Sequence, residues 1–401
     1  MSSKQGYSIT TWRLRLRCRH PDWLKETQDF FNQVEQFYYD LLLEHQELWN
    51  LNSQKTLRAL EMLSLPGREK RVPENPFPWT DVPLYFRRAA ANAGIAAAKS
   101  YITREEKFPS RKASSFNSAV VYYKGMYRDF SSGEITLKVW GNEKWQWMRC
   151  RLYGRDFPKD AQIMSPSVVF EQEFTMLHVP VKEITRDIST VKNRMEEGRN
   201  VCGIQFSNCD AFAVCSISDK AGQELAVKFF KGGKEYSHRC RLILEKIEKS
   251  KKSLGEVKEG HPNKKYWMHL KHLADYYAHK ISREIINFCE EHEAAVIALP
   301  KYDEEYTRHV MYGSGDWSPI HLSMRIREYL SYKAWKSGII VIEVNARGIS
   351  SVCAVCGKQV EATDKKTDEF FCEDGHRGNR FLNSARNLGK KCLVQFGKQV
   401  G

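Results

Sequence analysis

The sequence contains no run of about 18 apolar residues, so it offers no segment that would cross a bilayer as a helix. Its N-terminus is polar, and the first strand-like stretch carries Arg13, Arg15, Arg17 and Arg19, which does not fit a secretory signal. We therefore expect a cytoplasmic protein with no membrane partner. The 11 cysteines are then expected to be reduced thiols or metal ligands, because disulfides do not persist in a reducing compartment.

Acidic residues are too few to balance the basic ones. Lys and Arg number 63 and Asp and Glu 49, which gives a formal charge of +14 and an isoelectric point near 9.1. Solvated lysines alone can produce such an excess, but here basic residues are interleaved with aromatic ones. Because basic groups neutralise phosphate and aromatic rings stack on bases, this pattern favours nucleic-acid binding, although Trp145 and Trp147 also fit a barrel core. The clusters are 12–15, 85–88, 122–124, 145–151 and 264–267.

The first half of the chain predicts a barrel with an insertion. Its 401 residues, 42% of them hydrophobic, are enough for two or three domains with their own cores. Residues 7–19 alternate as in a strand with a basic face, and apolar spacing predicts helices over 21–42 and 53–64. A stretch rich in small residues predicts a further helix over 84–99, in which alanines allow close packing and Arg87 and Arg88 stay outside. Short strand patterns follow within 118–185. A strand, then helices, then strands indicate a small β-barrel that carries a helical insertion.

The second half has a different pattern, in which strands alternate with helices. The predicted strands cover 201–206, 212–217, 296–299 and 339–344, and the predicted helices cover 234–252, 262–291 and 323–337. Such alternation is typical of an α/β layer domain.

Five landmarks in this half occur in a recognisable order. They are Gly203-Ile204, His238-Arg239, Asn263-Lys264-Lys265, the strand and cysteine pair Val344–Cys353, and the last helix Asn383–Leu388. In this order and spacing, residues 200–390 resemble the TnpB family of transposon-encoded, RNA-guided nucleases and its relatives, the compact type V CRISPR effectors. The first half agrees with that family in layout.

The resemblance implies a multidomain fold that combines α/β and β-barrel parts. A RuvC-like (RNase H-like) α/β domain would carry a zinc-ribbon insertion, and an N-terminal wedge-like β-barrel would carry a helical recognition insertion. The implied boundaries are 1–20 and 118–197 for the barrel, 21–117 for the recognition lobe, 198–350 and 378–401 for the RuvC-like domain, and 351–377 for the ribbon, which binds target nucleic acid.

A cysteine pair, Cys353 and Cys356, precedes Cys372. In the family a fourth cysteine follows three residues after the third, where this sequence has Gly375 and then His376. The resemblance thus implies a structural Cys3His zinc site, because four protein ligands leave no open position for catalysis. The alternatives are a ribbon that has lost its metal and survives by packing, and a redox-active cysteine pair.

The three carboxylates that the family uses for cleavage are missing at their expected positions. RuvC-type nucleases hold two metal ions between clustered acids. Matching the family's motifs onto this chain gives Gln205, Pro300 and Phe381 instead. Magnesium requires hard, anionic oxygen ligands, so we expect no catalytic magnesium and no nuclease activity.

Displaced acids would rescue catalysis, and they are the alternative to a lost activity. The candidates are Asp210, Asp219, Asp303, Glu304 and Glu305. The last three lie just beyond the strand that ends at Pro300, where a solvated acidic turn is the simpler interpretation.

The resemblance without the acids implies an RNA-guided DNA-binding protein that binds a guide RNA and a double-stranded DNA target next to a short flanking motif. It would be associated with the nucleoid and would repress transcription by occupancy, which makes the transcription machinery a further partner. The candidate nucleic-acid contacts are Arg13, Arg15, Arg87, Arg88, Lys99, Arg239, Lys264, Lys265 and Arg347.

Three other hypotheses remain open at this point. The chain is a nuclease-dead targeting subunit that recruits a transposase or a sigma-like partner, an active guided endonuclease that uses the displaced acids, or a decayed transposon protein without function.

Overall fold

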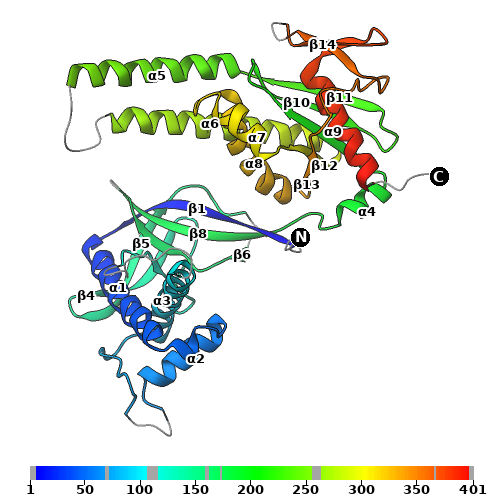
Figure 1. Ribbon diagram of the computed structural model, residues 1–401. Coiled ribbons are helices and arrows are strands. Elements are labelled where there is room, and N and C mark those ends of the chain that lie inside the picture. The colour runs from blue at the N-terminus through cyan, green and yellow to red at the C-terminus, as the bar shows by residue number, and fades with distance from the viewer. Residues whose placement is uncertain are drawn as a thin grey trace. The chain divides into compact units, whose positions relative to one another are not determined.

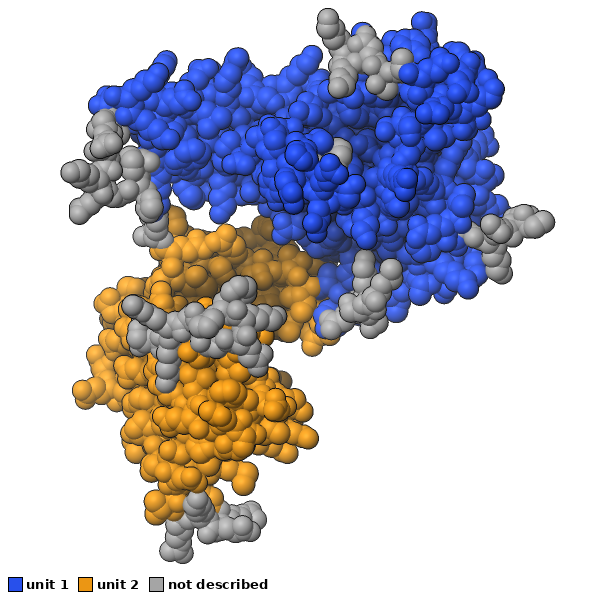
Figure 2. Space-filling model, in the orientation of Figure 1, with its two compact units in different colours: residues 1–8, 184–401 blue, residues 9–183 orange. Residues whose placement is uncertain are grey.

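The computed structural model describes residues 6–67, 72–105, 116–158, 162–171, 174–254, 263–364 and 367–396. The chain divides into two compact units, residues 9–183 and residues 1–8 with 184–401 (Figure 2). Within the described ranges, no helix is both long enough and apolar enough to span a membrane.

The smaller unit, residues 9–183, combines a large sheet with helices (Figure 1). Its helical segments are α1 (Pro21–Glu44), the 3-10 turn η1 (Gln46–Leu48), α2 (Ser53–Ser64) and α3 (Leu84–Glu105). Its strands are β1 (Tyr7–Cys18), β2 (Val120–Val121), β3 (Tyr127–Arg128), β4 (Glu134–Gly141), β5 (Lys144–Tyr153), β6 (Gln162–Ile163), β7 (Ser167–Phe170) and β8 (Thr175–Ile184).

The strands of this unit form one sheet in the order β2-β7-β8-β1-β5-β4-β3, with β6 paired to β8. In the described residues the sheet has two ends, so the predicted barrel is an open half-barrel. Leu14 and Leu16 of β1 are buried and alternate with outward-facing arginines, as the period-2 pattern predicts. Gly94 allows α3 to pack closely on α1, because a Cβ there would lie 2.6 Å from the carbonyl oxygen of Glu35.

The larger unit contains a second sheet with the strand order β11-β10-β9-β12-β13. β10 runs antiparallel to both of its neighbours, whereas β9, β12 and β13 are parallel and therefore end at the same edge. These strands are β9 (Asn200–Phe206), β10 (Ala211–Ser218), β11 (Glu224–Lys231), β12 (Ala294–Lys301) and β13 (Ile340–Asn345).

Helices cover both faces of this sheet, because successive residues of its strands point to opposite faces and are apolar on each of them. On β9, Ile204 packs in the core formed with α5, α6 and α8, whereas Val201 packs against α9 and α4. The helical segments of this unit are α4 (Val191–Glu196), α5 (Gly233–Leu254), α6 (Lys264–Glu291), α7 (Glu304–Tyr306), the π-helical turn η2 (Thr307–Tyr312), α8 (Pro319–Lys336) and α9 (Arg380–Phe396). In Figure 1, α5 and α6 run side by side and extend beyond the sheet.

A small third sheet, in the order β14-β15-β16, lies between β13 and α9 in the chain. Its strands are β14 (Val360–Asp364), β15 (Glu369–Cys372) and β16 (Arg377–Asn379).

In the larger unit the sequence prediction missed strand β11 and the short helical segments α4, α7 and η2, and it placed the start of α8 at residue 323 instead of Pro319. In the smaller unit it ended α3 too early. β11 was not predicted because it is an edge strand whose side chains are mostly exposed or half-buried, so its apolar alternation is weak. α3 continues to Glu105, beyond the predicted end at residue 99. The finer division into four domains stays a prediction.

Candidate nucleic-acid and metal sites

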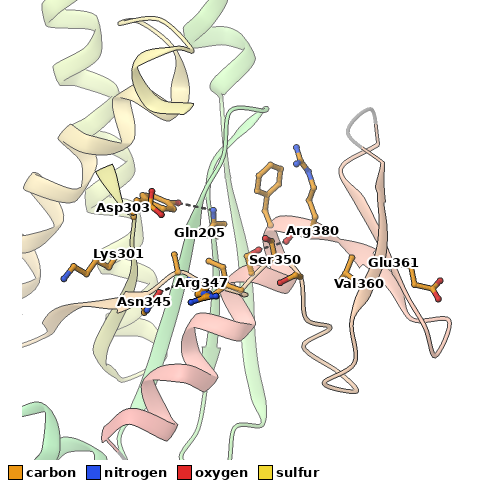
Figure 3. Close-up of a pocket in the computed structure, with 15 residues that line it drawn as sticks. Gln205, Lys301, Asp303, Asn345, Arg347, Ser350, Val360, Glu361 and Arg380 are labelled. Carbon is orange, nitrogen blue, oxygen red and sulfur yellow. Dashed lines mark hydrogen bonds between the residues drawn. The ribbon is translucent and has the colours of Figure 1, made fainter. Parts of the chain in front are cut away.

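A cavity of about 990 Å³ opens at the edge of the larger unit's sheet where the parallel strands end (Figure 3). Gln205 on β9, Lys301 at the end of β12, Asn345 at the end of β13 and Phe381 on α9 all line it. In open α/β sheets, ligands bind at the carboxyl ends of parallel strands. The cavity is thus the first candidate site of this unit.

Gly203 determines how α9 approaches this edge. A Cβ at this position would lie 2.0 Å from the carbonyl oxygen of Ala385, so any other residue would push α9 away from β9. Gln205 follows two residues later on the same face of the strand. Phe381 lies about one helical turn before Ala385 on α9. The close contact at Gly203 therefore brings two of the three positions predicted from the sequence to one cavity.

Gln205 presents a neutral amide at the end of β9. Its side chain is 8% exposed, and its Nε2 donates to the backbone oxygen of Phe206 at 3.1 Å and to the hydroxyl of Tyr302 at 3.2 Å. Its buried Oε1 has no hydrogen-bond partner in the described part of the chain. An amide oxygen can contact a metal, but it does not offset the charge of a divalent cation.

Pro300 is buried near the end of β12, and its carbonyl oxygen accepts a hydrogen bond from Arg327 at 2.8 Å. The guanidinium carbon of Arg327 lies 5.1 Å from the ring centre of Phe206 and 5.0 Å from that of Tyr302. Arg327 also pairs with Glu343 at 3.3 Å. The position at which the sequence analysis expected a missing carboxylate thus holds a buried proline, and a fixed positive charge stands beside Tyr302, where it disfavours a further cation.

Phe381 is held by its neighbours at the start of α9. Its backbone N–H donates to Asn379 at 3.0 Å, and the guanidinium carbon of Arg380 lies 4.4 Å from its ring centre. Arg380 in turn donates to Asp368 at 2.9 Å, and Asp368 also accepts from the thiol of Cys209 at 3.4 Å. The start of α9 is therefore tied to the β14–β15 hairpin and to the turn after β9.

Basic and acidic side chains share the lining of the cavity. Arg347 joins Lys301 and Arg380 on the basic side, while Asp303 and Glu361 provide the acids. In Figure 3, Lys301 and Glu361 extend away from Gln205. Asp303 is thus the one displaced acid, among the five candidates, that lines the same cavity as Gln205.

The other displaced acids lie elsewhere. Asp210, in the turn between β9 and β10, accepts the backbone N–H of Lys234 at 3.4 Å and lines a separate cavity of about 570 Å³. Asp219 follows β10 at the opposite edge of the sheet, and its carboxylate closes a turn by accepting the N–H groups of Ala221 and Gln223, each at 2.9 Å. Glu304 and Glu305 are exposed in α7.

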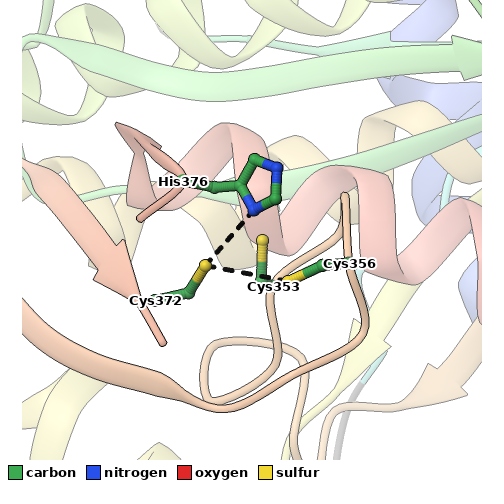
Figure 4. A group of neighbouring side chains, drawn as sticks. All are labelled: Cys353, Cys356, Cys372 and His376. Carbon is green, nitrogen blue, oxygen red and sulfur yellow. Dashed lines mark hydrogen bonds between the residues drawn. The ribbon is translucent and has the colours of Figure 1, made fainter. Parts of the chain in front are cut away.

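Four side chains of the small sheet region converge as predicted for a metal site (Figure 4). The Sγ atoms of Cys356 and Cys372 lie 3.7 Å apart, and the Sγ of Cys372 lies 3.5 Å from Nδ1 of His376. The ligand atoms of Cys353, Cys356, Cys372 and His376 all lie within 4.8 Å of one another. Tetrahedral zinc with bonds of about 2.3 Å to sulfur has sulfur–sulfur edges of about 3.8 Å, so the set fits zinc.

The backbone around these residues shapes the set. The N–H of Cys353 donates to Lys358 at 2.8 Å, and the N–H of Cys372 donates to the carbonyl of His376 at 3.1 Å. Gly375 has a φ of +77°, a left-handed conformation that favours glycine. The turn at Gly375 places His376 beside Cys372. In the family, the fourth cysteine stands one position earlier in the sequence, where this chain has Gly375. Of the described residues, only this set forms a group of three or more potential metal ligands.

The outer face of the half-barrel carries the basic residues predicted on β1. Arg15 lies over the ring of Phe174, with 3.8 Å between the guanidinium carbon and the ring centre, and Arg13 pairs with Glu171. The antiparallel register places Arg17 opposite Arg151 and Arg15 opposite Tyr153. A cavity of about 430 Å³ on this strand pair is lined by Arg17, Cys18, Arg19, Arg149, Arg151 and Tyr153.

We name Arg17, Arg19, Arg149, Arg151 and Tyr153 the arginine face. None of these residues was among the individual contacts predicted from the sequence, although Arg149 and Arg151 lie in the predicted basic and aromatic cluster 145–151. The signal was nevertheless present, because every second residue from Trp147 to Tyr153 is aromatic or basic. Trp145 is a core residue that packs on Phe86, with 4.7 Å between ring centres, whereas Trp147 is 38% exposed.

Arg87 and Arg88 are not free cations on the surface of α3. Both bind Glu61 of α2, Arg87 at 3.3 Å and Arg88 through two hydrogen bonds at 2.9 and 2.8 Å. The side chain of Arg87 is only 14% exposed, so the expectation that both arginines stay outside is wrong for Arg87. Lys99 donates to the carbonyl oxygen of Leu51 and lines a small polar cavity.

The remaining predicted contacts are exposed on the larger unit. Arg239 on α5 pairs with Glu235 at 2.7 Å, and Lys264 and Lys265 begin α6. The amine of Lys265 lies 4.9 Å from the ring centre of Tyr266. Arg347 lies at the cavity that also contains Gln205.

Comparisons with known proteins agree with this architecture. Two family models match parts of the chain, the Aq_aa04 family over residues 8–141 and the Cas12f1-like TNB domain over residues 324–388. No curated protein sequence matches.

Two solved structures share the fold over most of the chain. The first is a cryo-EM structure of the Cas12f1–sgRNA–target DNA complex, with a TM-score of 0.56 at 14% identity, covering 92% of this chain and 81% of the other. The second is the mini-RNA-guided endonuclease CRISPR-Cas phi3, with a TM-score of 0.54 at 9% identity, covering 99% of this chain and 94% of the other.

The fold is therefore the multidomain α/β fold of the compact CRISPR effectors, with a half-barrel sheet and a possible zinc site. A Cas12f1-like TNB family model thus matches residues 324–388, and the fold over most of the chain is similar to that of compact type V effectors. The family resemblance predicted from the sequence is confirmed.

Proposed function

We propose that the protein is a nuclease-inactive, RNA-guided DNA-binding protein that represses transcription by occupying its target. It binds a guide RNA and a complementary DNA segment next to a short flanking motif. The observation that carries the proposal is the cavity at the strand ends, which contains Gln205 and Phe381 where a nuclease of this family needs acids.

Similarity to guided effectors supports the binding half of the proposal. The Cas12f1 structure that shares this fold contains a single-guide RNA and target DNA. In this chain the arginine face places four arginines and a tyrosine around one cavity, and of these arginines Arg149 is paired with Glu134. Such a surface suits the phosphates and bases of RNA, since guanidinium groups pair with phosphate and aromatic rings stack on bases.

Loss of cleavage is supported by the chemistry at the strand ends. We take the larger unit as a RuvC-like domain, because its parallel strands β9, β12 and β13 end around the cavity and α9 lies across β9. Two-metal cleavage needs several anionic ligands within a few ångströms. Gln205 is neutral, Pro300 and Phe381 have no ligand atom in their side chains, and Arg327 adds positive charge beside Tyr302. If the larger unit is a RuvC-like domain, the Cys3His set is the metal site of the zinc ribbon that this domain carries.

A second candidate function is a guided endonuclease that uses Asp303. This carboxylate lines the same cavity as Gln205, which is the reason to test it. One carboxylate does not neutralise two divalent cations, so we rank this function second.

The test begins with the RNA that co-purifies with the full-length protein. Sequencing that RNA identifies the guide, and a DNA duplex that matches its variable segment becomes the substrate. We expect guide-dependent binding of this duplex and no strand scission in magnesium or manganese. A scrambled guide should abolish specific binding, which separates base pairing from attraction to the basic surface.

Guide-dependent cutting that is lost in Asp303→Ala would establish the second function and refute the first. Failure of specific binding with the co-purified RNA would refute both. In cells that lack the genes neighbouring the one for this protein, the wild-type protein should repress a reporter whose promoter overlaps the target. Repression that needs such genes would instead indicate a recruiting subunit.

A further inference from the structure

Cys18 and Cys150 face each other across two neighbouring strands of the half-barrel. In the antiparallel pairing of β1 with β5, Cys18 is the direct partner of Cys150, just as Leu16 is the partner of Leu152. Directly opposed residues in antiparallel strands have Cα atoms about 4.5–5.5 Å apart. A disulfide spans Cα separations of about 4.4–6.8 Å, so the backbone already has the spacing that a bridge requires.

The two thiols differ in exposure and in acidity. Cys18 lies at the end of β1 and is partly exposed, whereas Cys150 is 0% exposed. A hydrogen bond from the Cys150 thiol lowers the pKa of Cys18 and outweighs its burial, and the backbone N–H of His20 lowers it further. The same hydrogen bond, together with burial, raises the pKa of Cys150. Because peroxide can reach the partly exposed Cys18 and not the buried Cys150, Cys18 is the expected nucleophile and Cys150 is the second thiol beside it.

We propose that Cys18 and Cys150 form a peroxide-sensitive pair that closes to a disulfide between β1 and β5. The thiolate sulfur of Cys18 attacks one oxygen of a peroxide, the O–O bond breaks, and a sulfenic acid forms as hydroxide leaves. The sulfur of Cys150 then attacks the sulfenic sulfur. The S–S bond forms, and the leaving hydroxide takes the Cys150 proton as water. Two thiols lose two electrons, and one hydrogen peroxide becomes two waters.

The other cysteines of the sheets do not combine these features. Cys202 and Cys215 also lie on neighbouring strands, but they are not direct partners, since Cys202 is opposite Ile217 and Cys215 is opposite Ile204, and both are 0% exposed. Their double variant is therefore a matched control for a buried thiol pair. Cys353, Cys356 and Cys372 belong to the metal-binding set and give distinct peptides.

The strands joined by the bridge also carry Arg17 and Arg151 of the arginine face. The pair therefore lies in the strands that the proposed function uses, but its chemistry does not depend on that function. The reactivity can be measured without guide or target.

The experiment treats the full-length protein with stoichiometric hydrogen peroxide, blocks free thiols by alkylation and maps peptides without reduction. Trypsin is unsuitable, because Arg17–Arg19 and Arg149–Arg151 place each cysteine in a two-residue fragment. Chymotrypsin leaves both in longer peptides. We expect a linked peptide pair containing Cys18 and Cys150, which dithiothreitol separates. The unfolding midpoint of the oxidised protein should rise, and the rise should disappear on reduction.

Single variants separate the two steps of the chemistry. Cys150→Ser should stop at the sulfenic acid, so that dimedone labels Cys18. Cys18→Ser should leave Cys150 unmodified, and the Cys202→Ala/Cys215→Ala variant should still form the bridge. If peroxide leaves Cys18 unmodified in the wild type, or oxidises it without linking it to Cys150, the proposal is wrong. Because wild-type mapping decides this, a variant that fails to fold does not affect the result.

Discussion

Asn383 on α9 accepts the backbone N–H of Ala354 at 2.7 Å, and its side-chain amide donates to the carbonyl of Val352 at 2.8 Å. The side chain is 1% exposed, so both bonds are made away from water. Asn387, one turn later, also donates to the carbonyl of Val352, at 2.7 Å. The loop that carries Cys353 is therefore held by the helix that begins at the strand-end cavity.

We expect Asn383→Ala to destabilise the larger unit by about 1–3 kcal/mol, because it leaves the backbone N–H of the buried Ala354 without a partner and removes one of the two hydrogen bonds to the carbonyl of Val352. Chemical unfolding of the full chain measures this loss. The control is Gln395→Ala on the same helix, whose side chain is exposed and should change the free energy of unfolding by less than about 0.5 kcal/mol. Equal effects of the two variants would contradict the role of Asn383.

The four potential ligands Cys353, Cys356, Cys372 and His376 predict one bound zinc per chain. Substitution of His376 tests this prediction. His376→Ala should lower the zinc content measured by elemental mass spectrometry and lower the unfolding midpoint. His376→Cys should retain zinc, because a fourth thiolate also completes a tetrahedral site. A zinc content that is unchanged in a Cys353→Ser/His376→Ala double variant would show that the metal is bound elsewhere.

The arginine face predicts a salt-dependent loss of RNA affinity. Arg17→Ala combined with Arg151→Ala should weaken binding of the co-purified RNA and reduce the slope of log affinity against log salt by about 1 for each phosphate contact removed. Arg58→Ala is the control, because Arg58 is exposed on α2, away from this strand pair. If both variants bind equally well at every salt concentration, the arginine face does not contact RNA.

Lys333 predicts a pH dependence of stability. The residue is 6% exposed, and its amine donates to Ser282 at 2.7 Å. Burial, aided by the nearby Arg283, lowers the pKa of this amine to about 8 from 10.5. Between these two values the unfolded chain binds more protons than the folded one, so stability attributable to this group rises with pH across that window. Below about pH 8 the amine is charged in both the folded and the unfolded chain, so burial of the charge lowers the free energy of unfolding by its full amount.

The measurement compares Lys333→Met with the wild type by chemical unfolding from pH 7 to pH 10.5. The variant should be relatively most stable at pH 7, and its advantage should shrink as pH rises. Cysteines and tyrosines that titrate in the same range affect both proteins alike, so the difference isolates Lys333. A difference that does not change with pH would argue against a depressed pKa.

Much of the fold followed from local pattern. The alternation in 7–19 predicts β1 with its arginines outward, and apolar spacing predicts the helices, because these signals act within a few residues. The edge strand β11 was not predicted, because its exposed and half-buried side chains do not alternate clearly between apolar and polar. Sequence reasoning placed Gln205 and Phe381 at separate landmarks, but their common cavity depends on the contact between Gly203 and Ala385, which are far apart in the chain.

The sequence by itself determined the basic charge, the order of the family landmarks, the cysteine pattern and the absence of acids at three positions, because each is a property of residue identity and spacing. Tertiary structure alone decided which charges are available. Glu61 binds Arg87 and Arg88, whereas strand register gathers Arg17 and Arg151 beside Cys18 and Cys150. Pairing between distant segments sets these contacts through the geometry of packed strands and helices, which no short stretch of sequence encodes.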